Sequence, residues 1–300
     1  MPFALNAYLP SLKKEVQIRE LHYRQYRELV KSLYNSDKKE TIQQYNSILL
    51  DLCPDVKDID ITFEDKLSLL LTVRNYCVSP DLKLKSVAAN KDTFVCSITV
   101  DTLIKGIKTI DKSRMVELDN IKVSLSSHKV RDEHVFIGNN KDIFIKVASY
   151  IDNIALNGTM VYFKDLTIED RLKIVHSLPY LFFDKIYASI LEVEQIHDAQ
   201  PFLVVTNPMT QETVLTISKN ITFDTLQKLI EYIFTEELNN VYRAFYNMVK
   251  YAGFTPQYID SITPIEMQVY WMYYNQDVEE RKKDQQESGG FPGLNSELGF

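Results

Sequence analysis

The sequence predicts an α+β fold, with mostly helical N- and C-terminal parts, a β-rich insert in the middle and a short β-hairpin. Three observations predict it. Apolar residues recur with a helical period over much of the first 80 residues and again from about residue 167. β-branched residues alternate with polar ones between about residues 83 and 138. Two further runs of this kind flank a turn near residue 207.

The chain opens with a predicted pair of strands. Alternation within Ala7–Leu21 suggests two short strands around a turn at Ser11–Lys14. A first helix follows, with a period of about 3.6 residues carried by Leu21, Tyr23, Tyr26, Leu29 and Leu33. Ser36 and Asp37 can cap a second helix. That helix ends at Cys53–Pro54, because the residue before a proline disfavours the α conformation.

The same helix start occurs repeatedly along the chain. In Thr62–Asp65 a threonine stands at the N-cap position and an acid stands three residues later, as in a capping box. The pattern returns at Thr167–Asp170 and, more loosely, at Thr222–Leu226. We interpret the three as independent helix caps. A remnant of internal duplication is the alternative.

The middle and C-terminal elements follow from the same rules. Strands are expected at Thr93–Val100 and Ile121–Leu125. A helix resumes near Asp142, with Ile143, Val147, Ile151 and Ile154 on one face. Long helices cover about 167–198, a hairpin with a turn at Asn207–Pro208 covers about 202–218, and helices cover most of the chain from Thr222 to about Gln286.

These elements group into four expected segments. Residues 1–80 hold the strand pair and the first helices, residues 81–138 form a β-rich domain, residues 139–286 form a mainly helical domain that includes the hairpin, and residues 287–300 form a flexible tail.

Glycine is scarce and unevenly placed. Four of the eight glycines fall in the last twelve residues, at Gly289, Gly290, Gly293 and Gly299. The rest of the chain therefore lacks the clustered glycines of a P-loop, a dinucleotide-binding fingerprint or a nucleophile elbow. This distribution points towards assembly and away from catalysis.

Residues for metal or acid–base chemistry are also scarce. None of the five histidines has a partner at zinc-ligand spacing, so no metal or cofactor is expected. We expect His128 and His134 in a solvated charged turn and His176 in a helical core. The three cysteines, Cys53, Cys77 and Cys96, fit no metal pair and are expected as buried reduced thiols. A hydrolase that uses paired carboxylates from distant parts of the chain remains an alternative.

The overall composition sets limits on partners. The net charge of −7 disfavours non-specific binding to nucleic acid, which depends on lysine and arginine. The longest apolar runs, such as Leu69–Val73, are much shorter than the ~20 residues of a membrane span. The N-terminus lacks the pattern of a signal peptide. We therefore expect a soluble protein without nucleic-acid or membrane partners.

The C-terminal region carries an unusual aromatic cluster. Residues 267–274 read Met-Gln-Val-Tyr-Trp-Met-Tyr-Tyr and follow Thr263–Pro264, a helix start with proline at the first position. On a helix this cluster places bulky groups on every side. It is either a central helix enclosed by its own domain or a surface that docks a partner through Tyr270, Trp271, Met272 and Tyr274.

The tail offers a second candidate contact. After the charged run Asp277–Asp284, residues 287–294 read Glu-Ser-Gly-Gly-Phe-Pro-Gly-Leu, too poor in side chains to fold alone. The tail is either disordered or anchored on another subunit through Phe291, Leu294 and Phe300.

Several segments together resemble a known family. They are Tyr8–Leu9–Pro10–Ser11, Ile18–Leu21, Cys53 at a helix end, Phe63, Asp65, Leu69, Leu71, Arg74, Ser79, Leu166–Asp170, Ser177–Pro179, Asn207–Thr210, Leu238–Tyr242, Phe245, Pro264–Glu266 and Tyr270. Spread over nearly the whole chain, they resemble the baseplate hub subunit and hub-assembly family of T-even-like contractile-tailed bacteriophages.

The resemblance implies a nonenzymatic role in building the central hub of a phage baseplate, as a virion subunit or as an assembly chaperone. The implied partners are other baseplate or hub proteins, and a homo-oligomer is left open. The implied location is the host cytoplasm during assembly, with the tail baseplate of the virion as the location of a built-in subunit.

Overall fold

The computed structural model describes residues 5–57, 59–87, 93–108, 110–139, 141–156, 158–234 and 238–287, and its α+β architecture confirms the predicted fold class. Its helices are α1 (Tyr23–Ser32), α2 (Lys38–Leu52), α3 (Phe63–Cys77), α4 (Val100–Ile107), α5 (Ile143–Tyr150), α6 (Ile168–Ser177), α7 (Tyr180–Asp198), α8 (Phe223–Ile233), α9 (Leu238–Lys250), α10 (Pro256–Ser261) and α11 (Pro264–Glu287). Short 3₁₀ helices are η1 (Pro54–Val56), η2 (Val130–Phe136) and η3 (Phe163–Asp165).

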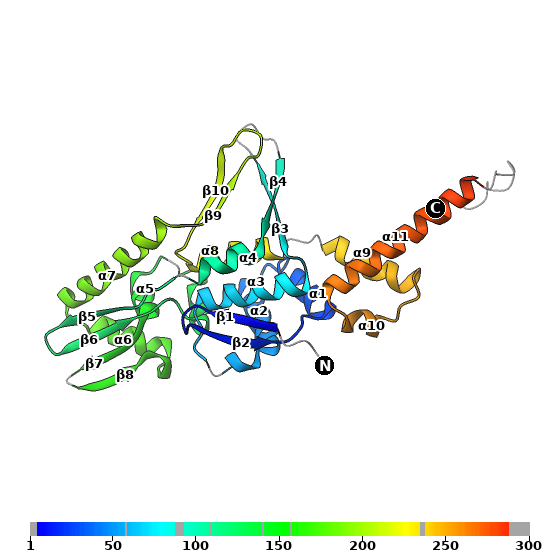
Figure 1. Cartoon of the computed structure of the whole chain (residues 1–300). Helices are drawn as coiled ribbons and strands as arrows, with labels where there is room; N and C mark the ends of the chain where they lie inside the picture. The colour runs from blue at the N-terminus through cyan, green and yellow to red at the C-terminus, as the bar shows by residue number, and fades with distance from the viewer. Residues whose placement is uncertain are drawn as a thin grey trace.

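The described strands form antiparallel hairpins and one larger sheet. They are β1 (Leu5–Leu9), β2 (Lys14–Ile18), β3 (Asp81–Val87), β4 (Thr93–Thr99), β5 (Arg114–Leu118), β6 (Ile121–Leu125), β7 (Ile151–Leu156), β8 (Thr159–Tyr162), β9 (Pro201–Thr206) and β10 (Thr213–Ser218). β5 to β8 pair in chain order as a four-stranded sheet. The hairpins β3–β4 and β9–β10 stand side by side and project from the body (Figure 1).

Two clusters of buried apolar residues hold the chain together. The main core joins the first strand pair, α1 to α4, both projecting hairpins and the C-terminal helices. The second core lies between the four-stranded sheet and α5, α6 and α7, and it includes Val123 and Ile154 of the sheet and Phe182 and Ile186 of α7. Figure 1 shows this second unit on the left, beside the main body.

Most predicted elements appear where the pattern places them. Asp37 caps α2 by accepting from the amides of Lys39 and Glu40, and the helix ends before Cys53–Pro54. The hairpin of β9 and β10 turns at Asn207, whose side chain accepts from the amide of Met209 at 2.9 Å. The helices expected from residue 167 to 198 are α6 and α7. These elements form locally because their caps and turns are satisfied by neighbouring residues.

The helix expected near Asp142 is shorter than predicted. Asp142 caps α5, but the helix ends at Tyr150, and Ile151 and Ile154 lie in β7. This strand pairs with β6 on one side and β8 on the other. Ile151 and Ile154 also fit a helical period, but this agreement is a coincidence of their spacing, because both residues lie in a strand that is paired on both sides.

Helix α4 was likewise not expected within the β-rich segment. The four-segment division of the chain stays a prediction.

The central helix of the fold is α3. Thirteen of its fifteen residues are buried, including Glu64, Asp65, Lys66 and Arg74. The predicted capping box is formed: Thr62 Oγ1 accepts from the Asp65 amide at 3.3 Å, and Asp65 accepts from the Thr62 amide at 2.9 Å. Asp65 also accepts from the amide and hydroxyl of Ser11 at 3.0 and 2.5 Å. One cap therefore orients α3 and anchors the first β-turn.

The helix caps at Thr62 and Thr167 are similar, so they allow a matched test of how much burial adds to the stabilising effect of a cap. Thr62 is fully buried, whereas Thr167, which caps α6 through the Asp170 amide, is exposed. We expect Thr62→Ala to lower the free energy of unfolding by about 1–3 kcal/mol, because it leaves a buried amide without an acceptor. Thr167→Ala should lower the free energy of unfolding by only about 0.5–1 kcal/mol, because the Asp170 amide that it frees can bind water. Urea denaturation of both variants measures this, and equal losses would contradict the prediction.

Candidate interaction surface and the buried charges behind it

A fully buried ion pair joins α3 to η2. Lys66 Nζ lies 2.8 and 2.6 Å from the two carboxylate oxygens of Glu133, and both side chains are fully buried. Glu133 also accepts from Asn46 of α2 at 3.2 Å and from Gln227 of α8 at 2.8 Å. Burial lowers the pKa of Lys66, and Glu133 opposes this shift. The single carboxylate thus joins four elements, from residue 46 to residue 227.

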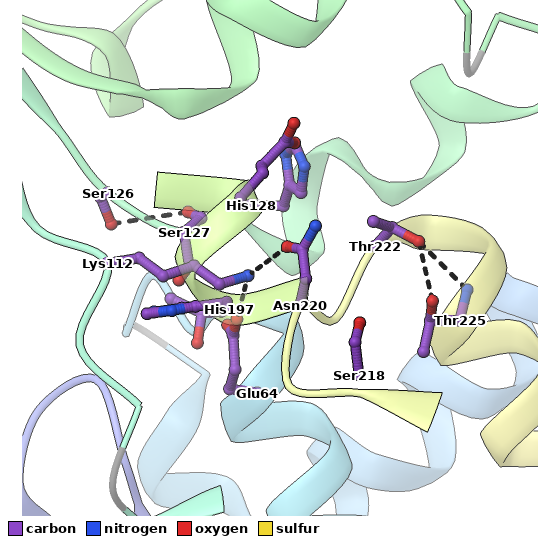
Figure 2. A network of polar contacts seen from close by, with 12 residues as sticks. Glu64, Lys112, Ser126, Ser127, His128, His197, Ser218, Asn220, Thr222 and Thr225 are labelled. Carbon is purple, nitrogen blue, oxygen red and sulfur yellow. Dashed lines mark hydrogen bonds and ion pairs between the residues drawn. The ribbon is translucent and has the colours of Figure 1, made fainter. Parts of the chain in front are cut away.

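A second buried pair lies where the chain passes between the two cores. Lys112 follows Ile110 of the main core and precedes Val116 of the second core. Its Nζ lies 2.9 Å from Glu64 Oε1 and donates to Asn220 Oδ1 at 3.0 Å. Figure 2 shows the amine between these two side chains, which come from α3 and from the loop between β10 and α8.

Two further ion pairs involve buried carboxylates. Asp132 of η2 accepts from Arg171 of α6 at 2.6 Å, and Arg171 also donates to the carbonyl of Leu166. Within the second unit, Glu194 of α7 accepts from Lys146 at 2.5 Å and from Tyr150 at 3.1 Å. Of the five buried carboxylates among the described residues, Glu64, Asp132, Glu133 and Glu194 each have a cationic partner, whereas Asp65 accepts hydrogen bonds from Ser11 and from the Thr62 amide. This arrangement neutralises charge and holds elements together.

The prediction of a solvated turn around His128 is wrong. His128 is buried between Tyr150, Phe136 and Phe63, with ring centroids 4.2, 5.0 and 5.4 Å away. Burial, followed by the charges of Lys112 and Lys146, holds its pKa well below the usual value, so the imidazole is neutral. Ser149 donates to the carbonyl of Lys146, so His128 Nδ1 must donate to Ser149 Oγ.

The neighbouring residues divide between core and surface. Asp132 and Glu133 are buried, whereas His134 is exposed as expected. His176, expected in a core, is exposed on α6 and packs against the ring of Phe144 at 4.2 Å. The buried residues of α6 are Arg171 and Val175 instead.

The cysteines are free thiols. Cys53 and Cys77 are buried as predicted, and Cys96 is half-buried. Burial raises the pKa of both buried thiols to about 11, so they stay protonated and unreactive. Among the described residues, no three histidine, cysteine or acidic side chains group closely enough to hold a metal ion.

The C-terminal helix α11 has two apolar stripes on opposite sides. The inner stripe packs on the main core and consists of Met267, Tyr270, Trp271 and Tyr274. The outer stripe faces solvent and consists of Ile265, Val269, Met272 and Tyr273, which are 37, 41, 52 and 57% exposed. At 100° per residue, these two sets fall on opposite halves of the helix.

The inner stripe is built into the body. Tyr270 lies 5.1 Å from the ring of Phe254, and its hydroxyl is hydrogen-bonded to that of Tyr258 at 2.9 Å. Trp271 stacks on Tyr274 at 5.5 Å and lines a groove of about 520 Å³ between α1, β3, α9 and α11. These contacts hold one side of α11 against the core and leave the opposite side open.

The residues predicted to bind a partner therefore occupy different places. Tyr270, Trp271 and Tyr274 are half-buried in the inner stripe, and Met272 lies in the outer stripe. Ile265, Val269 and Tyr273 belong to the same exposed face and were not singled out from the sequence. The signal in the sequence that could have identified them is their spacing of three and four residues, which places them on the same helix face as Met272. Phe291, Leu294 and Phe300 lie outside the described residues.

A family model described as T4 bacteriophage base plate protein matches residues 3–223. The chain belongs to this family of phage baseplate proteins. The matched segment of this baseplate protein includes α3 and every ion pair described above, and it ends before α9, α10 and α11. No curated protein and no solved structure shows a significant match to the chain. None of the helices in the described part of the chain has the length and apolar character needed to cross a membrane.

Breaking the central ion pair tests its structural role. We expect Lys66→Met to lower the free energy of unfolding by about 3–5 kcal/mol, because Glu133 would remain charged and buried without a cation. The double variant Lys66→Met/Glu133→Gln removes the charge and keeps groups that can bond to Asn46 and Gln227. It should recover most of the loss in urea denaturation. A single variant within about 0.5 kcal/mol of the wild type would refute the assignment.

The buried neutral histidine predicts a pH dependence of stability. The pKa of His128 is lower in the folded state than the ~6.5 of the unfolded chain, so the unfolded state binds the proton first as pH falls. Stability is therefore present above about pH 6.5 and is lost below it, by at most about 1.4 kcal/mol per pH unit.

Two variants separate the contribution of His128 to the pH dependence of stability from the contributions of other titrating groups. His128→Asn keeps a donor for Ser149 and should flatten the dependence between about pH 6.5 and about pH 5. His134→Asn, at an exposed position, should leave the wild-type slope unchanged. Urea denaturation across this range measures both, and an unchanged slope in His128→Asn would contradict the prediction.

Proposed function

We propose that this baseplate protein is nonenzymatic and helps to build the central hub of the phage baseplate through protein–protein contacts. The outer stripe of α11 carries the proposal. Exposed methionine, tyrosine and aliphatic side chains on one helix face are typical of binding surfaces and lower solubility unless they are covered. The partners are other baseplate or hub proteins, and the site of action is the assembling or completed tail.

The alternative of a hydrolase with paired carboxylates has less support. Among the described residues, four of the five buried acids, Glu64, Asp132, Glu133 and Glu194, are paired with lysine or arginine, and the fifth, Asp65, accepts hydrogen bonds from Ser11 and from the Thr62 amide. A general acid requires a carboxyl that stays protonated near neutral pH, which an adjacent cation disfavours. The observed pairing favours a scaffold role.

A charge placed in the outer stripe should block assembly without unfolding the protein. Met272→Glu in the phage should reduce the yield of complete tails at least about tenfold, because a binding surface cannot readily bury an unpaired carboxylate. Met160→Glu on β8 is a matched control, since Met160 is 47% exposed and Met272 is 52% exposed. Normal assembly of the Met272→Glu phage, with the protein folded and expressed, would reject this surface.

Mass spectrometry of purified virions, compared with assembly intermediates, distinguishes the two forms of the proposed role. A built-in subunit should be present in both samples at the same stoichiometry. A transient assembly factor should be present in the intermediates and depleted from the virions.

A further inference from the structure

The helices α9, α10 and α11 form one unit beside α1. Figure 1 shows them together at one end of the body, and α1 contacts all three. Within the unit, Phe254 stacks on Tyr258 at 5.6 Å, and the ring of Tyr270 in α11 lies 5.1 and 6.3 Å from these two rings. The three helices are therefore joined to one another as well as to α1.

Little of this unit is buried. The buried residues of α9 are Val241 and Met248, and that of α10 is Ile259. Among the described side chains of α11, Pro264 and Met267 in the first turn are buried. In α3, by contrast, thirteen of fifteen residues are buried. Segments with few buried apolar contacts open at a lower free energy than the core of the same protein.

The contact between this unit and the body is also incompletely packed. The groove of about 520 Å³ lies between them, with Tyr26 and Lys83 of α1 and β3 on one side and Val241, Met267 and Trp271 of α9 and α11 on the other. Side chains that line a groove lose the dispersion contacts that close packing would give them. Attachment of the unit therefore depends on a small set of specific contacts.

Arg27 of α1 connects α1 to two helices of the unit. Its guanidinium lies 4.0 Å from the ring centre of Phe245 and 5.8 Å from that of Tyr242, both in α9. It also forms an ion pair with Asp260 of α10. The side chains of Arg27 and Asp260 are only 14 and 29% exposed, and this partial shielding from water strengthens both the ionic and the cation–π interaction.

Tyr23, one helical turn before Arg27, supplies two hydrogen bonds to the unit. Its amide donates to the carbonyl of Ile262 at 2.7 Å, and its hydroxyl donates to the carbonyl of Val241 at 3.0 Å. Both acceptors are main-chain groups. A substitution at Arg27 therefore weakens the attachment and leaves these two bonds in place.

We propose that α9, α10 and α11 form a strap that opens from α1 as one unit while the rest of the fold stays intact, with Arg27 as its latch. Opening exposes Met267 and Trp271, which face α1 and β3 across the groove, in addition to the outer stripe. The strap rests on the proposed function, because its opening controls how much of α11 a partner can reach. Elements that move in switching proteins are drawn from such weakly held segments.

Hydrogen exchange of the full chain, followed by mass spectrometry, tests the strap. In the wild type, the amides of α9, α10 and the first half of α11 should exchange faster than those of α3. Arg27→Ala should raise the exchange rates of all three strap helices at least about tenfold and leave α3 unchanged, because the ion pair and the ring contacts are lost. Arg24→Ala, at an exposed position of the same helix, should match the wild type.

Three results of this experiment overturn the inference. The first is a wild-type strap that exchanges as slowly as α3, which decides the question even where a variant does not fold. The second is equal exchange in Arg27→Ala and Arg24→Ala. The third is an increase confined to α9 or α10, because α11 does not contact Arg27 directly in the described contacts and would respond only if the three helices open together.

Trp271 gives an independent measurement, because it is the single tryptophan of the chain and lines the groove. In Arg27→Ala, its fluorescence should shift to longer wavelength at a lower urea concentration than the loss of far-UV circular dichroism, because the strap opens before the fold is lost. Coincident transitions in this variant would count against the strap.

The strap and the proposed function fail separately, because exchange reports on the strap whatever the protein binds. If the strap opens as expected and Met272→Glu phage assemble normal tails, the strap is correct and the role of α11 in assembly is wrong. If the strap stays closed and Met272→Glu blocks assembly, the outer stripe acts on the closed form and the strap is wrong.

Discussion

The fold depends on the buried ion pair between Lys66 and Glu133. A lysine and a glutamate fully removed from water are tolerated only because each neutralises the other and the carboxylate accepts two further hydrogen bonds, from Asn46 and Gln227. These partners lie on four different elements, so α2, α3, η2 and α8 must dock together before the charges are satisfied. The pair therefore imposes one arrangement on segments that apolar packing alone would hold less specifically.

The same requirement explains why α3 is central. A helix with charged residues at 64, 65, 66 and 74 would ordinarily lie at the surface. Here Glu64 meets Lys112, Asp65 meets Ser11, and Arg74 donates to the carbonyls of Ile233 and Asp81. Each charge is directed at a different part of the chain, which makes α3 the element on which the others are positioned. Helix α11 is the opposite case, because its apolar residues exceed what the body buries.

The local sequence predicted much of the secondary structure and little of the burial. Caps at Asp37, Thr62, Thr167 and Thr222 mark helix starts because a side chain and an amide a few residues away satisfy each other. The prediction extended the helix of α5 wrongly into β7, because Ile151 and Ile154 also fit the helical period. The strands that pair with β7 lie elsewhere in the chain, so the local sequence does not reveal them. In the candidate surface, Met272 was singled out, while its neighbours Ile265, Val269 and Tyr273 were recognised only once the buried side of α11 was defined.

By itself, the sequence determined the α+β class, the absence of glycine-rich nucleotide loops, most helix boundaries and the presence of an aromatic C-terminal helix. These depend on contacts within a few residues or on composition. The tertiary structure alone decided that His128, Asp132 and Glu133 are buried, because the partners of the two acids lie 39 and 67 positions away in the chain. It also decided which side of α11 faces the core. A helix with apolar residues on every side has no preferred inner face until other elements bury one, and the face left in solvent is the one available to a partner.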